Sequence, residues 1–212
     1  MGKNKGNPDR VNLLLTGVLA IVFIWSAVRP RDYFTWLLEV APAIIGFVVL
    51  AATYRRFRFT QLVYTLCALH AIVLMVGGHY TYAEVPLFNW IRDTFGLTRN
   101  HYDRVGHFAQ GFVPAMVTRE ILLRTSPLRA GPWLATIVVA ICLAISALYE
   151  LIEWGVAVAS GSAADAFLGT QGDVWDTQKD MAICLAGALA ALLTLTRIHD
   201  RALASETTDI PV

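Results

Sequence analysis

The chain has 212 residues, of which 56% are hydrophobic and only 16% are charged. A water-soluble domain usually carries about 25% charged residues, so this chain lacks the polar surface of a soluble globule. The composition excludes a disordered protein, a nucleic-acid-binding domain and an ordinary soluble enzyme. Because 17 Lys and Arg residues nearly balance 16 Asp and Glu residues, the net charge indicates no charged partner.

Six stretches are candidates for membrane-spanning helices, because a helix needs about 20 residues to cross the hydrocarbon core. These stretches are residues 11–28, 36–54, 59–78, 105–123, 132–154 and 181–196. The fourth is the most polar, since it contains His107, Gln110, Arg119 and Glu120, but omitting it would leave an odd number of crossings between the flanking loops. We therefore expect an all-α, polytopic membrane bundle of six transmembrane helices.

The distribution of Lys and Arg predicts the orientation of this bundle. Most of them fall on the side that also holds the two termini, and the turn 55–58 alone carries three arginines. Positively charged loops stay in the cytoplasm, so we expect both termini there. Residues 1–10 would be a cytoplasmic N-terminus, residues 11–196 a single six-span domain, and residues 197–212 a cytoplasmic tail. Most acidic residues fall on the opposite, outer side, where we expect the functional site.

Two longer links are expected on the outer side, at residues 79–104 and 155–172. In the first, Leu87, Phe88, Ile91 and Phe95 recur at helical spacing, which predicts a short amphipathic helix lying at the membrane interface. The second is rich in Gly and Ala and is expected to fold back over the bundle. In the last span, the stripe Ala182, Ala186 and Ala190 predicts close helix packing within the chain.

Ionisable residues inside a membrane segment cost several kcal/mol unless they are paired or hydrated, so each needs an explanation. They form three sets near the predicted outer ends of spans, and the spacing within each set places most of its members on one helical face. The sets are His101, Asp103, His107 and Gln110; Glu150 and Glu153; and Asp173, Asp176 and Asp180. We expect the acids and His107 to line one cavity between the fourth, fifth and sixth spans, with His101 and Gln110 at its rim.

Carboxylates that lie together repel one another unless a cation neutralises them. The available partners are Arg104, Lys179, the histidines, protons or a metal ion. Oxygen and imidazole ligands without a thiolate suit Zn, Mn, Fe, Mg or Ca. In this interpretation a divalent metal is held by ligands drawn from Asp103, His107, Asp173, Asp176 and Asp180, and Glu150 or Glu153 is the catalytic general base. The alternative is a scaffold, in which these groups only fix helix register and Asp173 only caps a helix.

Three lone polar residues are expected outside this cluster. His70 has no acid near it in sequence and is expected to be a packed histidine with one hydrogen bond. Glu39 is expected to pair with Arg29 or Arg31 at the surface. His79 is expected to belong to an interfacial aromatic belt rather than to the cluster.

Several motifs resemble the YjdF-like family of bacterial inner-membrane proteins, whose function is unknown. They are residues 99–104 (RNHYDR), 106–108 (GHF), 110–112 (QGF), 149–154 (YELIEW), 169–173 (GTQGD) and 175–178 (WDTQ). The resemblance covers residue 59 to the C-terminus and implies a multi-pass location in the bacterial inner membrane, without implying a reaction.

A fainter likeness is to VanZ-like envelope proteins, which share the order D-x-x-x-H-F, S-x-x-x-E and then spaced polar residues. Residues 103–108 and 146–150, followed by Asp176 and Asp180, are similar to that order. Glu153 and Asp180 depart from the Gln and Asn of that pattern, so the likeness does not carry over a ligand set.

Three functions follow from these features. The first is a metal-dependent hydrolase or transferase acting on a lipid or envelope substrate at the outer leaflet, since a bound metal lowers the pKa of water and creates a nucleophile. The second is a proton or cation transporter, because intramembrane acids mark ion paths. The third is a non-catalytic structural subunit. The lipid bilayer is the one partner expected, no nucleic acid is expected, and the sequence leaves the substrate and the oligomeric state open.

Overall fold

The computed structural model describes residues 8–160, 167 and 170–207, and all regular structure in them is helical. The helices are α1 (Pro8–Ala27), α2 (Tyr33–Thr53), α3 (Gln61–His79), α4 (Pro86–Phe95), α5 (Tyr102–Thr125), α6 (Pro132–Ser160) and α8 (Asp176–Thr207). Each of the six stretches expected to span a membrane is a helix. The expected amphipathic helix is α4, whose apolar and polar residues separate onto opposite sides.

Within the described residues, α1, α2, α3, α6 and α8 are long and apolar enough to cross a membrane. Helix α5 is long enough, but its polar residues keep it outside that group. The ends of α6 and α8 extend beyond the apolar stretches that predicted them, α6 to Ser160 and α8 back to Asp176. Both extensions carry polar or small residues, which hydropathy alone does not assign to a spanning helix. The protein is therefore an all-α membrane protein with several apolar spans.

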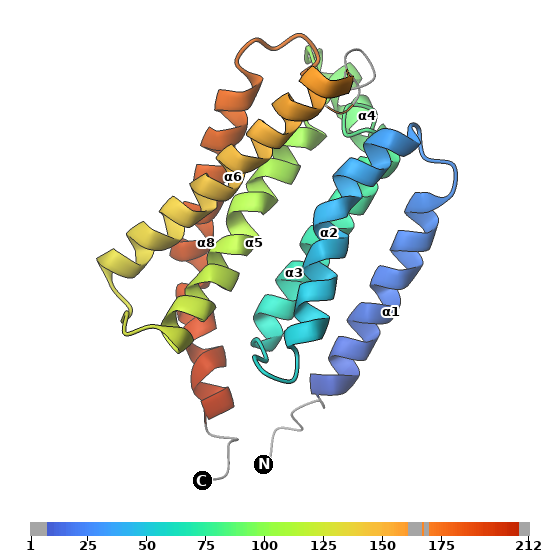
Figure 1. The fold of residues 1–212 in the computed structure, drawn as a ribbon. Helices are drawn as coiled ribbons and strands as arrows, with labels where there is room; N and C mark the ends of the chain where they lie inside the picture. The colour runs from blue at the N-terminus through green and yellow to red at the C-terminus, as the bar shows by residue number, and fades with distance from the viewer. Residues whose placement is uncertain (1–7, 161–166, 168–169, 208–212) are drawn as a thin grey trace.

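The bundle consists of two groups of helices that are each contiguous in sequence (Figure 1). Helices α1 and α2 pack against α3, while α5, α6 and α8 pack against one another, and α3 and α5 provide the main contact between the groups. We call this contact the seam. The start of α1 and the end of α8 lie at one end of the bundle, the termini end, and α4 lies at the other, the α4 end.

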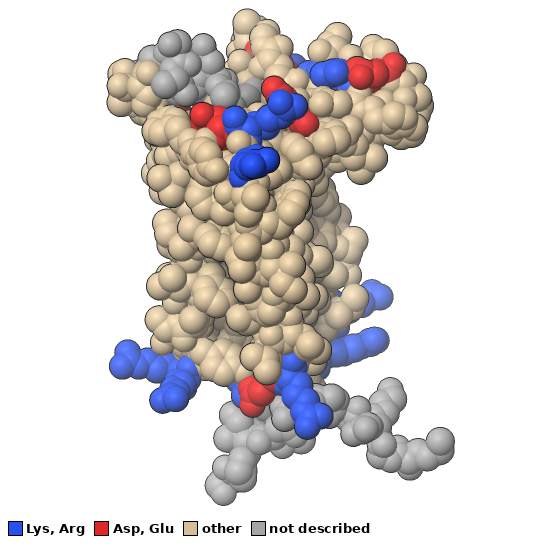
Figure 2. Space-filling view, turned by 90° about the vertical axis from the view of Figure 1, so that its right-hand side faces the viewer, with Lys and Arg blue, Asp and Glu red and all other residues tan. Residues whose placement is uncertain are grey.

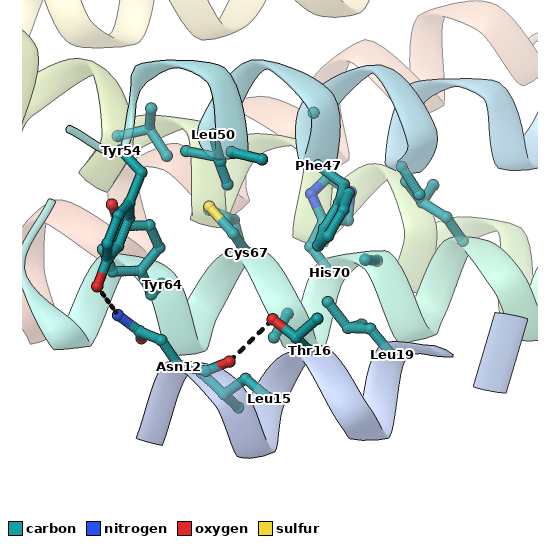
Figure 3. Close-up of a pocket in the computed structure, with 18 of the residues that line it drawn as sticks. Asn12, Leu15, Thr16, Leu19, Phe47, Leu50, Tyr54, Tyr64, Cys67 and His70 are labelled. Atoms are coloured by element: carbon teal, nitrogen blue, oxygen red, sulfur yellow. Dashed lines mark hydrogen bonds between the residues drawn. The ribbon is translucent and has the colours of Figure 1, made fainter. Parts of the chain in front are cut away.

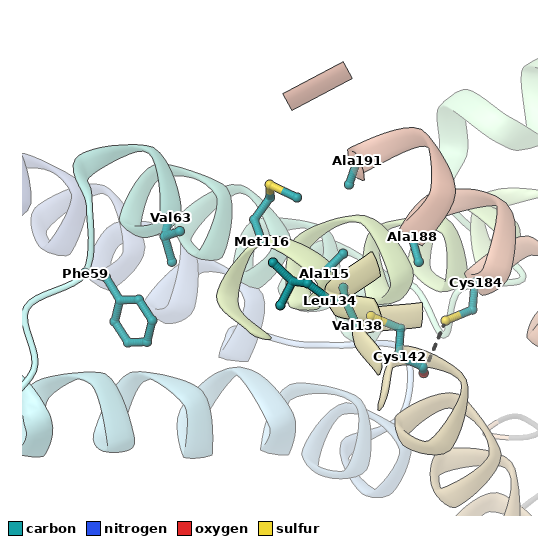
Figure 4. Packing of buried hydrophobic residues seen from close by; sticks show 10 residues of the cluster. All are labelled: Phe59, Val63, Ala115, Met116, Leu134, Val138, Cys142, Cys184, Ala188 and Ala191. Atoms are coloured by element: carbon teal, nitrogen blue, oxygen red, sulfur yellow. Dashed lines mark hydrogen bonds between the residues drawn. The ribbon is translucent and has the colours of Figure 1, made fainter. Parts of the chain in front are cut away.

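The largest apolar core lies where α3, α5, α6 and α8 meet (Figure 4). Its buried members are Phe59, Val63, Ala115, Met116, Leu134, Val138, Cys142, Cys184, Ala188 and Ala191. Several are small, because van der Waals packing rather than hydrophobic transfer holds helices together in lipid and small side chains let backbones approach. The core thus makes one rigid unit of α5, α6 and α8.

The closest helix approach joins α5 to α8 through two glycines. A Cβ atom on Gly111 would lie 2.7 Å from the carbonyl carbon of Cys184 and 2.9 Å from the amide nitrogen of Ala188, and closer still to the Cys184 carbonyl oxygen. A Cβ on Gly187 would lie 3.1 Å from the amide nitrogen of Phe112. Neither position has room for a side chain, so glycine at both sites sets the distance between the two helices.

The stripe of alanines expected to pack within the chain is on the wrong face of α8. Ala182 and Ala186 are exposed, and the buried face carries Cys184, Gly187 and Ala188 instead. Small residues occur on several faces of this helix, so spacing alone could not identify the face that packs. The contact with α5 selects it.

Charged side chains gather at the two ends of the molecule. On the face shown in Figure 2, mostly Lys and Arg lie at the termini end, charges of both signs lie at the α4 end, and the broad band between them carries none. Leu13, Ile21 and Leu193 are each exposed by 70% or more. Exposed apolar surface of this extent is unusual for a soluble protein and fits a surface covered by lipid.

Candidate functional site

His107 is the meeting point of three helices at the α4 end. Its Nε2 lies 3.4 Å from Oδ1 of Asp103, one turn earlier on α5, and 3.7 Å from Oδ1 of Asp180 on α8. Its Nδ1 lies 3.8 Å from Oε1 of Glu150 on α6. The ligand atoms of Asp103, His107 and Asp180 all lie within 4.8 Å of one another, a spacing that a single metal ion could bridge.

Gln110 orients the imidazole ring of His107. Its Oε1 lies 3.0 Å from His107 Nδ1. With this oxygen as the acceptor, Nδ1 carries the hydrogen, and in the neutral ring Nε2 keeps the lone pair that a metal needs. Histidines that bind metals usually donate their other N–H to such a partner. Gln110 was expected at the rim; the structure places it in the wall of the site, directly against the histidine.

Two arginines neutralise the aspartates beside this group. Arg104 forms ion pairs with Asp176 and Asp180 and lies 3.4 Å from Asp173, and Arg99 forms an ion pair with Asp176. Arg99 also lies 3.4 Å from Asp103, and its side chain is only 6% exposed. Because two guanidinium groups share Asp176, its charge is balanced by protein groups alone.

Arg99 was not among the partners expected from the sequence. The available signal was its position four residues before Asp103, which is the spacing of a helical ion pair. Arg104 and Lys179 were expected as partners, and both do neutralise acids: Lys179 Nζ lies 2.6 Å from Asp173 Oδ2.

Asp173 lies in the turn before α8 and not on the helical face that carries Asp176 and Asp180, as the spacing suggested. Its Oδ1 accepts a hydrogen bond from the backbone N–H of Trp175 at 3.1 Å. The hydrogen bond from Lys179 holds the pKa of the Asp173 carboxyl below its ordinary value. Asp173 therefore stabilises the turn that starts α8, a role close to the capping alternative.

A polar cavity of about 220 Å³ lies across the seam, between α2, α3, α5 and α6. Its polar lining comes from Glu39, His70, Asp103, His107, Gln110, Tyr149 and Glu153. Of the six acids and one histidine expected to line one cavity, Asp103, His107 and Glu153 do so. Glu150 and Asp180 lie beside His107, and Asp173 and Asp176 lie with the arginines.

Glu39 is a wall residue of this cavity, and its expected pairing with Arg29 or Arg31 is wrong. Its side chain is buried and accepts a hydrogen bond from the Tyr149 hydroxyl at 3.1 Å, while Arg31 pairs with the exposed Glu84 at 2.9 Å. Both arginines precede the start of α2, whereas Glu39 lies almost two turns into it, on a buried face.

The remaining expected residues occupy the periphery. His101 precedes the first residue of α5, where burial and the charges of Arg99 and Arg104 lower its pKa. His79 lies outside the cluster, as expected, with Nδ1 3.0 Å from the Ser26 carbonyl oxygen. His70 differs from expectation, because its buried Nε2 has no hydrogen-bond partner among the described residues. Of the link 155–172 expected to cover the opening, the first six residues belong to α6, and residues 161–166 and 168–169 lie outside the described residues.

Asn100 and Gln171 hold the start of α5 against the turn that leads into α8. The Asn100 backbone N–H donates to Gln171 Oε1 at 2.9 Å, and Gln171 Nε2 donates to the Asn100 carbonyl oxygen at 2.9 Å. The Asn100 side chain also donates to the Val85 carbonyl oxygen at 3.0 Å. These bonds fix the positions of the neighbouring Arg99 and Asp103 relative to the aspartates of α8.

A second buried polar cluster lies at the termini end, around Glu120. It accepts hydrogen bonds from the Thr60 backbone N–H at 2.9 Å, the Thr60 hydroxyl at 2.7 Å and Arg124 at 2.7 Å. His199 bridges Glu120 and Arg119, with 2.9 Å to each. Because a guanidinium can only donate, His199 Nδ1 accepts from Arg119 and its Nε2–H donates to Glu120.

Comparison with known proteins gives a family and a location. The family model described as "Predicted membrane protein (DUF2238)" matches residues 11–201. Inner membrane protein YjdF of Escherichia coli (strain K12) is 52% identical over 185 residues, which cover 87% of this chain and 88% of that protein. No solved structure matches the chain.

Proposed function

This chain belongs to the DUF2238 family of membrane proteins. We propose that it acts within the inner membrane as a metal-dependent hydrolase or transferase on a lipid or envelope substrate. The expected resemblance to YjdF-like inner-membrane proteins is confirmed. The family and its relative indicate the inner membrane and no reaction, so the reaction is argued from the cavity at the seam.

The proposal includes a topology in which α5 is the sixth span of a single membrane domain. The polar residues of α5 face α8, α6 and the cavity rather than lipid: Asp180, Glu150 and Glu39 surround its N-terminal half, and His199 and Asp200 pair with its C-terminal half. Charged residues that face protein can cross a bilayer. The excess of Lys and Arg at the termini end supports cytoplasmic termini, and with that orientation the cavity would lie near the outer face.

The observation that carries the enzymatic proposal is the group formed by Asp103, His107 and Asp180. Two carboxylates and one imidazole within 4.8 Å of one another offer three ligands and leave further coordination positions open. This donor set suits Zn, Mn, Fe, Mg or Ca. A metal bound there would lower the pKa of a water molecule and supply a nucleophile near neutral pH.

Residues around this group have separable roles in the proposal. Glu153 lines the cavity and is placed to exchange a proton with a substrate, while Glu150 lies beside His107. Gln110 holds the His107 ring with Nε2 toward the two aspartates. Arg104 pairs with Asp180 and limits the repulsion that this aspartate would otherwise exert on Asp103.

The proposal is tested by measuring metal content and affinity in protein purified without added chelator. Elemental analysis should find one divalent ion per chain, and Asp103→Asn should remove it. Gln110→Ala should weaken binding by about 10- to 100-fold, the usual effect of losing an orienting partner. Asp93→Asn is the matched control, because Asp93 is an exposed acid at the same end of the bundle, paired with Arg92. Equal metal content in Asp103→Asn and Asp93→Asn would refute the site.

One observation favours transport as a second candidate. His70 lies near the middle of α3, borders the polar cavity, and keeps a buried Nε2 without a partner among the described residues. A proton path would need such a relay between the two faces. Proton flux into vesicles that contain the protein, abolished by His70→Gln with bound metal unchanged, would replace the enzymatic proposal. A structural subunit would show neither metal nor flux in any variant.

A further inference from the structure

A second, larger cavity runs along α3 between α1, α2 and α5 (Figure 3). Its volume is about 620 Å³, and its walls are mostly apolar, with Leu15, Leu19, Phe47, Leu50 and Cys67 pointing into it. We call it the groove. Leu13, exposed by 72%, and Phe47, exposed by 45%, also line it, so it opens between α1 and α2 toward the surroundings of the bundle.

The groove adjoins the polar cavity, and we call the place where they share lining residues the junction. Pro42, His70, Leu74 and Pro114 line both. Pro42 lies inside α2 and Pro114 inside α5, and a proline within a helix leaves the carbonyl four residues earlier without its helical donor. The lining side chains therefore change from hydrocarbon in the groove to the imidazole of His70 at the junction and then to the carboxylates of the polar cavity.

Polar contacts close the groove at the termini end. Asn12 Nδ2 donates to the Tyr54 hydroxyl at 3.1 Å (Figure 3). That hydroxyl donates to Asp9 Oδ1 at 2.6 Å. From Tyr64 to Leu74, lining residues of α3 near its two ends, the groove extends about 15 Å at ~1.5 Å per residue. One leaflet contributes half of a hydrocarbon core of ~30 Å, which is also about 15 Å.

We propose that the groove holds the hydrocarbon chain of a lipid whose headgroup lies in the polar cavity. The substrate class is then an amphiphilic lipid, not a soluble envelope sugar or peptide. Binding of the hydrocarbon chain in the groove is argued from the groove alone. Binding of the headgroup in the polar cavity rests on the proposed function. Bound this way, the lipid reaches Asp103 and His107 through the junction at Leu74 without leaving the membrane.

The bilayer favours this occupant for a physical reason. Lipid tails are as apolar as leucine, so no hydrophobic transfer drives binding, but an empty apolar cavity forfeits dispersion contacts on all its walls. A lipid tail that enters between α1 and α2 restores these dispersion contacts.

Substitutions at Gly46 and Gly17 provide a test variant and its matched control. Gly46 lines the groove, whereas Gly17, on α1, does not. A Cβ at either position meets no atom within 4 Å, so a larger side chain is tolerated at both. Gly46→Phe should fill the groove, and Gly17→Phe should add the same ring elsewhere on a spanning helix.

The probe is phosphatidylethanolamine with a photoactivatable diazirine in one acyl chain, in nanodiscs that contain the purified full-length protein. Cross-links in wild type and in Gly17→Phe should map to the groove residues of α1, α2 and α3. In Gly46→Phe they should fall about tenfold, equivalent to about 1.4 kcal/mol. Cross-links spread evenly over all lipid-facing helices, or unchanged in Gly46→Phe, would overturn the proposal.

The same experiment in the presence of EDTA separates the two proposals. Groove labelling that persists with EDTA, in a protein that binds no metal, would leave the groove proposal standing and refute the metal site. A bound metal without groove-specific labelling would leave the metal site standing and refute the groove proposal. Labelling replaced by cross-links between two copies of the chain would show that a protein surface covers the groove and would also overturn the proposal.

Discussion

Replacing Gly111 with alanine tests whether the contact between α5 and α8 holds the metal-ligand group together. The added Cβ would lie 2.7 Å from the Cys184 carbonyl carbon, whereas carbon atoms pack at about 3.5–4.0 Å, so the helices must separate by about 1 Å. Backbone atoms cannot rotate away as a side chain can. Overpacking of this kind destabilises by about 1–3 kcal/mol, and the better helix propensity of alanine offsets up to about 1 kcal/mol of that.

The assay is thermal unfolding in detergent, followed by metal titration. We expect Gly111→Ala to lower the melting temperature by roughly 2–6 °C, at about 2–4 °C per kcal/mol for a chain of this size. Metal affinity should fall with it, because Asp103 and His107 are on α5 and Asp180 is on α8. Gly17→Ala, at a site with no neighbour within 4 Å, is the control and should be neutral or stabilising. If the two variants melt alike, close glycine packing does not set the helix distance.

Three further predictions concern other parts of the molecule. Glu120→Ala leaves the Thr60 donors and His199 buried without an acceptor and removes the partner of Arg124. At about 1–3 kcal/mol for each unsatisfied buried group, it should lower the free energy of unfolding by about 3–5 kcal/mol in denaturant titration. Glu84→Ala, at an exposed ion pair, should lower it by under about 1 kcal/mol, and similar losses would contradict the reasoning. Because its hydrogen bond with Lys179 lowers the folded pKa of Asp173 below the unfolded value, the stabilisation is present above the unfolded value and is lost as the pH falls through the folded one. The melting temperature should therefore fall more steeply on acidification for wild type than for Asp173→Asn, and parallel curves would refute this. Brominated lipids should quench Trp90, which is exposed by 61% on α4, and equal quenching of wild type and Trp90→Phe would show that α4 is not at the interface.

The helices could be predicted from the sequence because each apolar stretch is long and the amphipathic spacing around Ile91 is regular. Their ends could not, since residues such as Asp176 have no hydropathy signal and are helical because Arg99 and Arg104 neutralise them. The sequence also could not predict which small-residue face of α8 packs against α5, because choosing between Ala186 and Gly187 requires knowing where α5 lies.

The centre of the site could be predicted in part, because Asp103 and His107 are one turn apart and acids at helical spacing recur on two other segments. Glu39 could not, since a lone acid carries no periodicity and its partner Tyr149 is 110 residues away. The cluster around Glu120 could not be predicted for the same reason, because its partner His199 is 79 residues away in the sequence. Spacing identifies groups within one helix, and only the fold brings helices together.

The division of the bundle at the seam has a consequence for biogenesis. Each group of helices is contiguous in the chain, so α1, α2 and α3 can complete their mutual contacts while α5 and α8 are still being synthesised. The bonds that cross the seam, Thr60 to Glu120 at the termini end and Tyr149 to Glu39 at the α4 end, can form only afterwards. Docking of the two groups is therefore a late step of assembly, and the polar cavity does not exist until it is complete.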